Sequence, residues 1–249
     1  GIRDRSVSRG LGDVYKRQSL NMGFSADDAP EKVRENRKRF FDVLGIIPER
    51  LVNCALVHGI HMEKVGKADC GRGAQDFTSA IPACDGLYTN EKNVPLGLNY
   101  ADCTPILFYD PVTSSIAVAH GGWRGTAGNI AGEAVRHLQE SYGAEPKNIK
   151  VGIGPAIGKS VFEVEKDVVE AFEKIFDEEE MKRLSAPKGE GKILIDLPLA
   201  NRMLMERAGI LPENIEDCGI CTYCRNDLFY SYRKAAGRTG RHMAVMMLK

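Results

Sequence analysis

Residues 99–123 constrain the fold of this chain more than any other segment. Two apolar runs, TPILFY and SIAVAH, are joined by a turn at 110–114 that contains Pro111. The pattern predicts two strands that pair as an antiparallel hairpin. Such a pair disfavours a doubly wound parallel fold and indicates a mixed sheet.

The remaining pattern adds helices and shorter strands to this hairpin. Apolar residues at helical spacing predict helices within 26–45, 129–142 and 164–184, and a short strand running into a helix over 193–210. Strands are expected at 51–59, 85–90, 150–153, 215–224, 227–233 and 242–248. The fold class is therefore α/β, of the α+β kind, with mixed β-sheet layers covered by helices. With 43% hydrophobic residues, 249 residues are ample for the core of a single domain.

The first 18 residues differ from the rest of the chain. They are rich in Arg and Gly, lack apolar periodicity and resemble translated sequencing-adapter read-through. We therefore expect residues 1–18 to be a non-native or disordered segment, and residues 19–249 to form the domain.

Three residues that can bind a soft or borderline metal lie at or near the ends of apolar, strand-like segments: His58, Cys103 and His120. Side chains at strand ends can converge on a shared cleft. One thiolate and two imidazoles suit Zn²⁺ and leave a fourth position for water or substrate, which is the pattern of a catalytic site. Ordinary packing is the alternative for each residue alone, since a free Cys is commonly buried as a small apolar side chain.

A glycine-rich segment at 121–129 follows His120. Its spacing, like that of the segments at 152–158 and 237–243, fits neither the dinucleotide-binding motif nor the P-loop. Because the segment joins a strand to a helix, Arg124 and the loop amides are expected to face an anion beside the metal. The alternative is that Arg124 packs against Trp123 and forms an outward ion pair.

The spacing of Cys218, Cys221 and Cys224 raises the possibility of an iron–sulfur cluster or a structural zinc site. A ferredoxin-type cluster needs a fourth Cys nearby, and none follows Cys224. The favoured interpretation is small residues in a strand and turn. All seven cysteines of the chain are expected to be reduced thiols.

Charge and hydropathy argue against several classes of partner. The formal net charge is zero, so no basic field indicates nucleic acid or an anionic membrane surface. No apolar run approaches the ~20 residues that span a bilayer, and no signal-peptide pattern opens the chain. We therefore expect a cytoplasmic protein that acts on small molecules.

Several strings, in their order and spacing, resemble one family across residues 19–249. They are SLNMG with ENR, LVHG, DGLYTN, LNYADCTPILFYD, AVAHGGWRGT, GIGPAIG with FEV, and CTYCRNDLFYSYRK with TGRHMAVMML. The family is that of the laccase-domain proteins, once called multicopper polyphenol oxidases and now described as purine nucleoside phosphorylases. The resemblance implies one zinc ion bound by His58, Cys103 and His120. It also implies cleavage of adenosine, inosine or guanosine by phosphate, to free base and ribose 1-phosphate.

The resemblance further implies deamination of adenosine and phosphorolysis of methylthioadenosine. In the expected reaction the metal is an electrophile, and Arg124 holds phosphate by bidentate hydrogen bonds. Arg233 is a second candidate anion ligand, and Glu163 is a candidate contact to the ribose or to water. Strand alternation predicts that Asp102 points away from Cys103, as a buried hydrogen-bond acceptor or as a catalytic group.

Other functions remain open for the same residues. A metal-free cysteine hydrolase or deamidase would use Cys103 as nucleophile and His120 or His58 as base. A copper-dependent polyphenol oxidase needs a mononuclear copper and a trinuclear cluster, for which five histidines are too few, although adventitious Cu²⁺ can occupy the three-ligand site. A binding scaffold with a structural metal would need a fourth ligand.

Overall fold

The computed structural model describes residues 20–26, 28–189 and 191–249. The expectation for residues 1–18 falls outside these ranges. Within them no helix has the length and apolar character needed to cross a bilayer.

The centre of the molecule is a six-stranded mixed sheet in the order β11-β7-β5-β6-β3-β2. The predicted hairpin forms its middle, with β5 (Thr104–Asp110) antiparallel to β6 (Ser115–Gly121). Its neighbours β3 and β7 are antiparallel to the hairpin, whereas β2 and β11 pair in parallel with β3 and β7. The bounds of these four strands are Met62–Lys64 for β2, Gly86–Thr89 for β3, Lys150–Ile153 for β7 and Ile215–Asp217 for β11. The predicted mixed fold class is confirmed.

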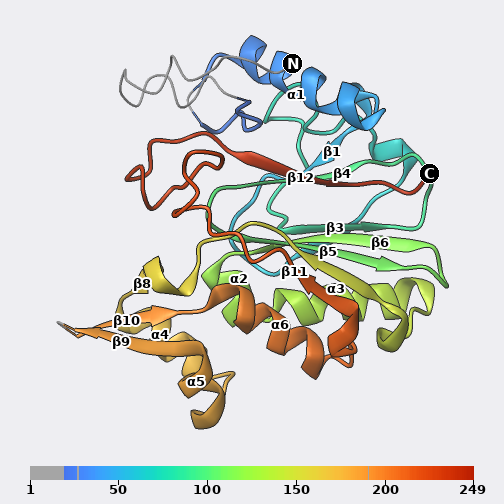
Figure 1. Cartoon of the computed structure of the whole chain (residues 1–249). Coiled ribbons are helices and arrows are strands. Elements are labelled where there is room, and N and C mark those ends of the chain that lie inside the picture. The colour runs from blue at the N-terminus through green and yellow to red at the C-terminus, as the bar shows by residue number, and fades with distance from the viewer. Residues whose placement is uncertain (1–19, 27, 190) are drawn as a thin grey trace.

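Both faces of this sheet are covered, which explains why every residue of β6 is buried. Helices α2 (Trp123–Ala127), α3 (Ile130–Tyr142) and α6 (Leu197–Arg207) lie on one face (Figure 1). A three-stranded sheet of β1 (Val52–Asn53), β4 (Leu96–Tyr100) and β12 (His242–Met246) covers the other. Strand alternation divides β6 between two cores, since Ala117 and Ala119 pack under the helices and Val118 packs toward β4.

The helix predicted within 26–45 is confirmed as α1 (Pro30–Leu44), which lies outside the three-stranded sheet (Figure 1). Pro30 stands in its first turn, where the missing N–H costs nothing, and Gly45 ends it in the left-handed region at φ 64°. Phe41 is fully buried and joins Leu51 and Met243 in a small third core.

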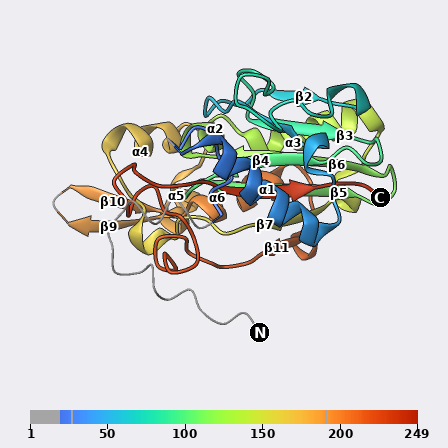
Figure 2. The same ribbon diagram turned by 90° about the horizontal axis from the view of Figure 1, so that it is seen from above.

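A third sheet, β8-β10-β9, projects from one end of the molecule (Figures 1 and 2). Its strands are β8 (Glu163–Val164), β9 (Ser185–Gly189) and β10 (Lys192–Ile195). The single helix predicted over 164–184 is wrong, because the segment forms α4 (Lys166–Glu173) and α5 (Glu178–Leu184). Asp177 marks the start of the second helix: its carboxylate caps α5 by accepting from the N–H of Glu180 at 2.9 Å. Short 3₁₀ turns in the described residues lie at Pro48–Arg50, Lys67–Asp69, Pro146–Asn148, Lys159–Val161 and Pro212–Asn214.

Three predicted strands are shorter than expected or absent. The segment 51–59 contributes only the two residues of β1, and 215–224 only the three of β11. The segment 227–233 is turn and bend rather than strand. Beyond these short strands the pairing is reduced to isolated bridges, between Cys54 and Ile81 and between Cys221 and Ala156.

Candidate metal centre

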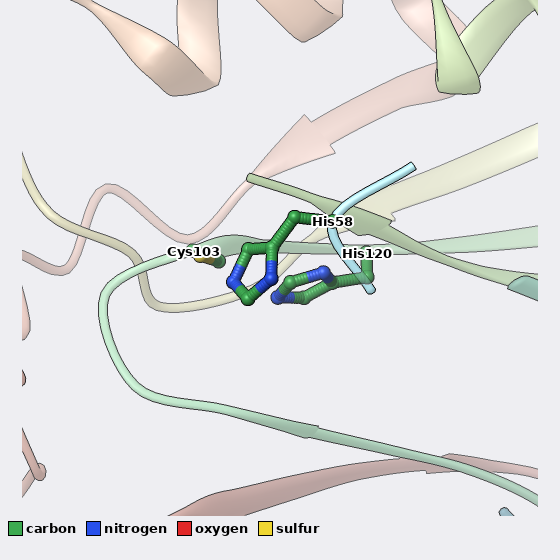
Figure 3. A group of neighbouring side chains, drawn as sticks. All are labelled: His58, Cys103 and His120. Carbon is green, nitrogen blue, oxygen red and sulfur yellow. The ribbon is translucent and has the colours of Figure 1, made fainter. Parts of the chain in front are cut away.

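The structure brings His58, Cys103 and His120 together, as predicted from the sequence. Their ligand atoms all lie within 4.8 Å of one another, and the two imidazole rings meet edge to face with centroids 5.0 Å apart (Figure 3). His120 is buried, Cys103 is partly buried and His58 is exposed. The group therefore has one side open to solvent.

Three separate parts of the chain supply these side chains. His120 is the next-to-last residue of β6, and its hairpin partner is Pro105, two residues after Cys103. Cys103 itself precedes β5, in a bend where Asp102 has a φ of 82°. The sequence predicted His58 at or near a strand end. The structure instead places it in the loop between β1 and β2, with a φ of 62°. Left-handed backbone at these two non-glycine residues turns the chain toward the centre.

A buried carboxylate that sequence reasoning missed, Asp85, organises two of the three ligands. Its Oδ1 lies 3.3 Å from Nδ1 of His120 and accepts the N–H of His58 at 2.8 Å. Its Oδ2 accepts the N–H of Gly59 at 2.7 Å. This one side chain therefore fixes the His58 loop and the ring of His120, and it leaves Nε2 of His120 for a metal.

The charges at the centre favour a thiolate. Burial raises the pKa of Cys103, but the neighbouring His120 and His58 outweigh it and lower the pKa to about 6. Burial lowers the pKa of His120, whereas Cys103 and Asp85 raise it to about 9. A thiol that ionises this readily is a good metal ligand, because binding a cation displaces the proton held between sulfur and imidazole.

Gly122 shows how closely the backbone passes the three ligands. A Cβ at this position would lie 3.2 Å from Sγ of Cys103 and 3.2 Å from Cδ2 of His58. Gly125 is also constrained, because its Cβ would lie 2.9 Å from the carbonyl oxygen of Gly59. The glycines of 121–129 thus let the start of α2 pack directly on the His58 loop. The donor set and this close packing fit a small metal ion, with His58, Cys103 and His120 as its ligands.

Arg124 packs against Trp123, which is one part of the alternative considered for it in the sequence analysis. Its guanidinium lies over the ring of Trp123, 4.1 Å from the centroid. The side chain is exposed, and among the described residues it forms neither an ion pair nor a hydrogen bond. The outward ion pair of that alternative is therefore absent from the described part of the chain. Binding of an anion by Arg124 stays a prediction.

Arg233 and Glu163 contact each other, although not through their charges. The Arg233 guanidinium donates to the carbonyl oxygen of Glu163 at 2.7 Å. The Glu163 carboxylate lies between Lys188 (2.7 Å) and Lys192 (2.5 Å), and hydrogen bonds from these lysines lower its pKa to about 2. The bond between Arg233 and Glu163 thus links β8 of the third sheet to the segment 222–233, which is bonded to Asp102. The contacts of Arg233 and Glu163 to substrate stay predictions.

Asp102 was predicted to be either a buried hydrogen-bond acceptor or a catalytic group, and in the structure it is a buried acceptor. It lies in a bend rather than in a strand, so the alternation argument does not apply to it. Its carboxylate accepts from Oγ1 of Thr222 at 2.6 Å, from Oγ of Ser231 at 3.0 Å and from the N–H of Arg233 at 2.6 Å. These bonds fasten residues 222–233 to the residue just before Cys103.

The three C-terminal cysteines do not form a metal site within the described ranges. The triad of His58, Cys103 and His120 is the one group there whose ligand atoms are close enough to share an ion. This finding supports the interpretation of Cys218, Cys221 and Cys224 as part of a strand and turn. It also leaves the described residues without the additional histidine groups that a four-copper oxidase requires.

The chain belongs to the family described as multi-copper polyphenol oxidoreductase laccase, whose model matches residues 3–249. The resemblance drawn from the sequence strings is thereby confirmed. The chain is 42% identical to the purine nucleoside phosphorylase YlmD of Geobacillus stearothermophilus, and the match covers 92% of this chain and 83% of that protein. A purine nucleoside phosphorylase of Bacteroides thetaiotaomicron is 35% identical over 90% of this chain and 83% of its own length.

Two solved structures superimpose closely on this chain and share its fold. The crystal structure of YlmD from Geobacillus stearothermophilus superimposes with a TM-score of 0.90 at 40% identity, covering 94% of this chain and 87% of that one. A hypothetical protein YfiH of Bacillus licheniformis superimposes with a TM-score of 0.91 at 37% identity, with the same coverage.

Proposed function

We propose that this protein is a zinc-dependent purine nucleoside phosphorylase. Its substrates would be adenosine, inosine or guanosine together with phosphate, and its products free base and ribose 1-phosphate. The observation that carries the proposal is the triad of His58, Cys103 and His120, supported by Asp85 and open on one side. The names of relatives that match almost the whole chain support the reaction class.

The ligand set suits an electrophilic metal. One thiolate and two neutral imidazoles would leave Zn²⁺ with a net charge near +1, so that it can polarise an oxygen of phosphate, water or ribose. Asp85 contributes by holding the His120 ring and the His58 loop in place.

Arg124 is the proposed phosphate ligand. It lies two residues after Gly122, whose backbone touches the triad, and its exposed guanidinium has no ion-pair partner within the described residues. A guanidinium can bind two phosphate oxygens at once while the ribosyl centre gains positive charge. Arg233 would supply a second cation, and the Glu163 segment would line the ribose side.

The proposal includes two secondary reactions, namely adenosine deamination and methylthioadenosine phosphorolysis. Both require recognition of a purine nucleoside at the same centre. Seven free cysteines fit a reducing compartment, so we place these reactions in the cytoplasm, with small molecules as the only partners.

A metal-free thiol enzyme is the second candidate. Cys103, His120 and Asp85 stand in the order of nucleophile, base and orienting carboxylate, and the pKa of Cys103 is lowered to about 6. Copper is the other alternative metal, and copper in the triad would give weak phenol oxidation at most, since one ion cannot reduce oxygen by four electrons.

The deciding experiment combines elemental analysis with product analysis. The purified chain, given inosine and phosphate, should contain about one zinc per chain and release hypoxanthine and ribose 1-phosphate only when phosphate is present. Chelation should abolish this activity, and phenol oxidation should stay negligible until Cu²⁺ is added. Activity that survives chelation would support the thiol nucleophile instead, and oxidase turnover in copper-free buffer without nucleoside cleavage would overturn the proposal.

A further inference from the structure

The segment after β11 holds three cysteines that nucleoside cleavage does not use, and two of them, Cys221 and Cys224, lie side by side. Cys221 opens a tight turn, in which its carbonyl oxygen accepts from the N–H of Arg225 at 2.9 Å. The N–H of Cys224 donates to Sγ of Cys221 at 3.4 Å. The sulfur of Cys221 therefore takes the position of a side-chain cap on this turn, and Cys224 stands three residues further on.

A second backbone donor reaches the same sulfur. The N–H of Gly158 donates to Sγ of Cys221 at 3.2 Å. A Cβ on Gly158 would lie 3.3 Å from both Cβ and Sγ of Cys221, tighter than most real contacts, so the glycine eases this approach. Two N–H groups aimed at one sulfur stabilise a thiolate relative to a thiol.

The second cysteine lies beside the first. The Cys224 side chain is exposed, and its backbone N–H reaches Sγ of Cys221 at 3.4 Å. Burial raises the pKa of Cys221, but the hydrogen bonds from Cys224 and Gly158 outweigh it and the pKa lies below its ordinary value. The neighbouring Cys221 side chain raises the pKa of Cys224. The pair thus combines one ionisable sulfur with one accessible thiol.

The other cysteine pair in the described residues is not accessible. Sγ of Cys54 and Sγ of Cys84 lie 3.6 Å apart, but both residues are buried in the core. A solvent-borne reagent cannot reach them without local unfolding. Access to solvent therefore singles out the 221–224 pair.

We propose that Cys221 and Cys224 form a thiol–disulfide exchange site whose substrate is a low-molecular-weight disulfide. The Cys221 thiolate attacks one sulfur of the disulfide, forms a mixed disulfide and releases one small thiolate, which takes a proton from water. The Cys224 thiol then loses its proton to solvent and attacks the Cys221 sulfur, which expels the second small thiol. The protein dithiol gives two electrons and two protons, and the small disulfide becomes two thiols.

This site is separate from the metal centre but adjoins its support. Thr222, between the two cysteines, donates through Oγ1 to Asp102 at 2.6 Å, and Asp102 immediately precedes Cys103. The exchange chemistry rests on Cys221, Cys224 and Gly158 alone, so it does not depend on the proposed nucleoside reaction.

The test uses the zinc-loaded full chain in buffers of reduced and oxidised glutathione. After acid quenching and alkylation of free thiols, the tryptic peptide 208–225 carries Cys218, Cys221 and Cys224. Oxidised buffer should give a fraction of this peptide that has lost two hydrogen atoms, with the bond between Cys221 and Cys224. Cys224→Ser should accumulate a stable glutathione adduct on Cys221, because the second attack is lost.

Two further variants make the result specific. Cys218→Ser, which removes the exposed cysteine outside the pair, should close the disulfide like the unsubstituted chain. Cys221→Ser should slow reaction of the peptide with oxidised glutathione at least about tenfold, since the stabilised thiolate is gone. The proposal fails if Cys218 or Cys103 takes up glutathione before the pair closes, or if Cys224→Ser forms no adduct on Cys221.

Discussion

The buried carboxylate of Asp85 lies 3.3 Å from Nδ1 of the buried His120 ring. It immediately precedes β3, which pairs with β6, and its backbone carbonyl accepts the N–H of His120 at 2.8 Å. The pairing of β3 with β6 thus fixes the position of the proposed metal ligand His120 relative to Asp85.

Replacing Asp85 by Asn should therefore weaken zinc binding without removing any ligand. Loss of the carboxylate frees the His120 ring and the His58 loop, and we expect zinc affinity to fall by about 10- to 100-fold. Competition with a chromophoric chelator measures the change. Asp110→Asn is the matched control: Asp110 is equally buried but lies at the other end of the hairpin, bonded to Val112 and Thr113. Equal losses in both variants would mean that Asp85 acts through general stability.

Substitution of any one triad residue should remove most of the metal. His58→Ala, Cys103→Ala and His120→Ala each leave two protein ligands, too few for stable zinc binding. Elemental analysis of the purified variants is the measurement, with His137→Ala as control, because His137 stacks on Tyr88 outside the triad. Full zinc content in Cys103→Ala would show that the metal binds elsewhere.

Arg124→Ala should lower phosphate-dependent cleavage by roughly 10² to 10³, since a cation that stabilises developing charge is lost. The fold should change little because the side chain is exposed. Initial rates across a phosphate titration give the comparison. Arg136→Ala, an exposed arginine paired with Glu133 and Glu140 on α3, is expected to leave the titration unchanged. If the Arg124 variant kept the rate and the phosphate saturation of the unsubstituted chain, Arg124 would not bind phosphate and its role would be to pack on Trp123.

Gly122→Ala should reduce zinc affinity by about tenfold or more. The added methyl group would lie 3.2 Å from the Cys103 sulfur and the His58 ring, so the ligands must move apart. The same chelator competition reports the effect. Gly152→Ala, where a Cβ meets nothing within 4 Å, serves as the control. If both variants bind zinc normally, the backbone at Gly122 tolerates a side chain and the centre is looser than described.

The unfolding free energy should fall when the pH drops from about 6.5 to about 4, partly because of His242. Burial lowers the pKa of this residue to about 4, and its Nε2 accepts the N–H of Tyr230 at 2.6 Å, which requires the neutral ring. Between the two pKa values the unfolded chain binds a proton that the folded chain does not, which costs up to about 3 kcal/mol. His242→Gln keeps an acceptor but cannot titrate, so denaturant unfolding of this variant should show a smaller loss over the same pH range. An identical pH profile would assign the acid sensitivity to other groups.

Local periodicity was enough to predict the hairpin and helices α1 and α3, because each carries its own apolar pattern and end signals. The triad was predictable from side-chain chemistry, since few residues besides Cys and His bind zinc. Asp85 was not, because its role depends on the pairing of β3 with β6, which no local pattern contains. The only signal was an acidic residue between buried Cys84 and the apolar strand 86–89.

One of the strand errors has the same cause. The segment 51–59 has the composition of a strand, yet the N–H groups of Val57, His58 and Gly59 donate to Asp85. Here a distant buried carboxylate takes the backbone donors that a strand would have used in a ladder. The orientation of Arg124 toward Trp123 was foreseen only as an alternative, because sequence spacing does not fix a rotamer.

The middle of the loop that carries His58, residues 57–59, is held by three backbone N–H bonds to one carboxylate, while Val57 and Ile60 are exposed. These three residues can detach without disturbing the sheet, so their opening would set the lifetime of a metal bound at the triad. Zinc would leave by a rare opening of residues 57–59 rather than by global unfolding. Amide hydrogens of His58 and Gly59 would therefore exchange with solvent at the rate at which the ion departs, and slow zinc transfer to a chelator would be a property of this loop rather than of the coordinate bonds.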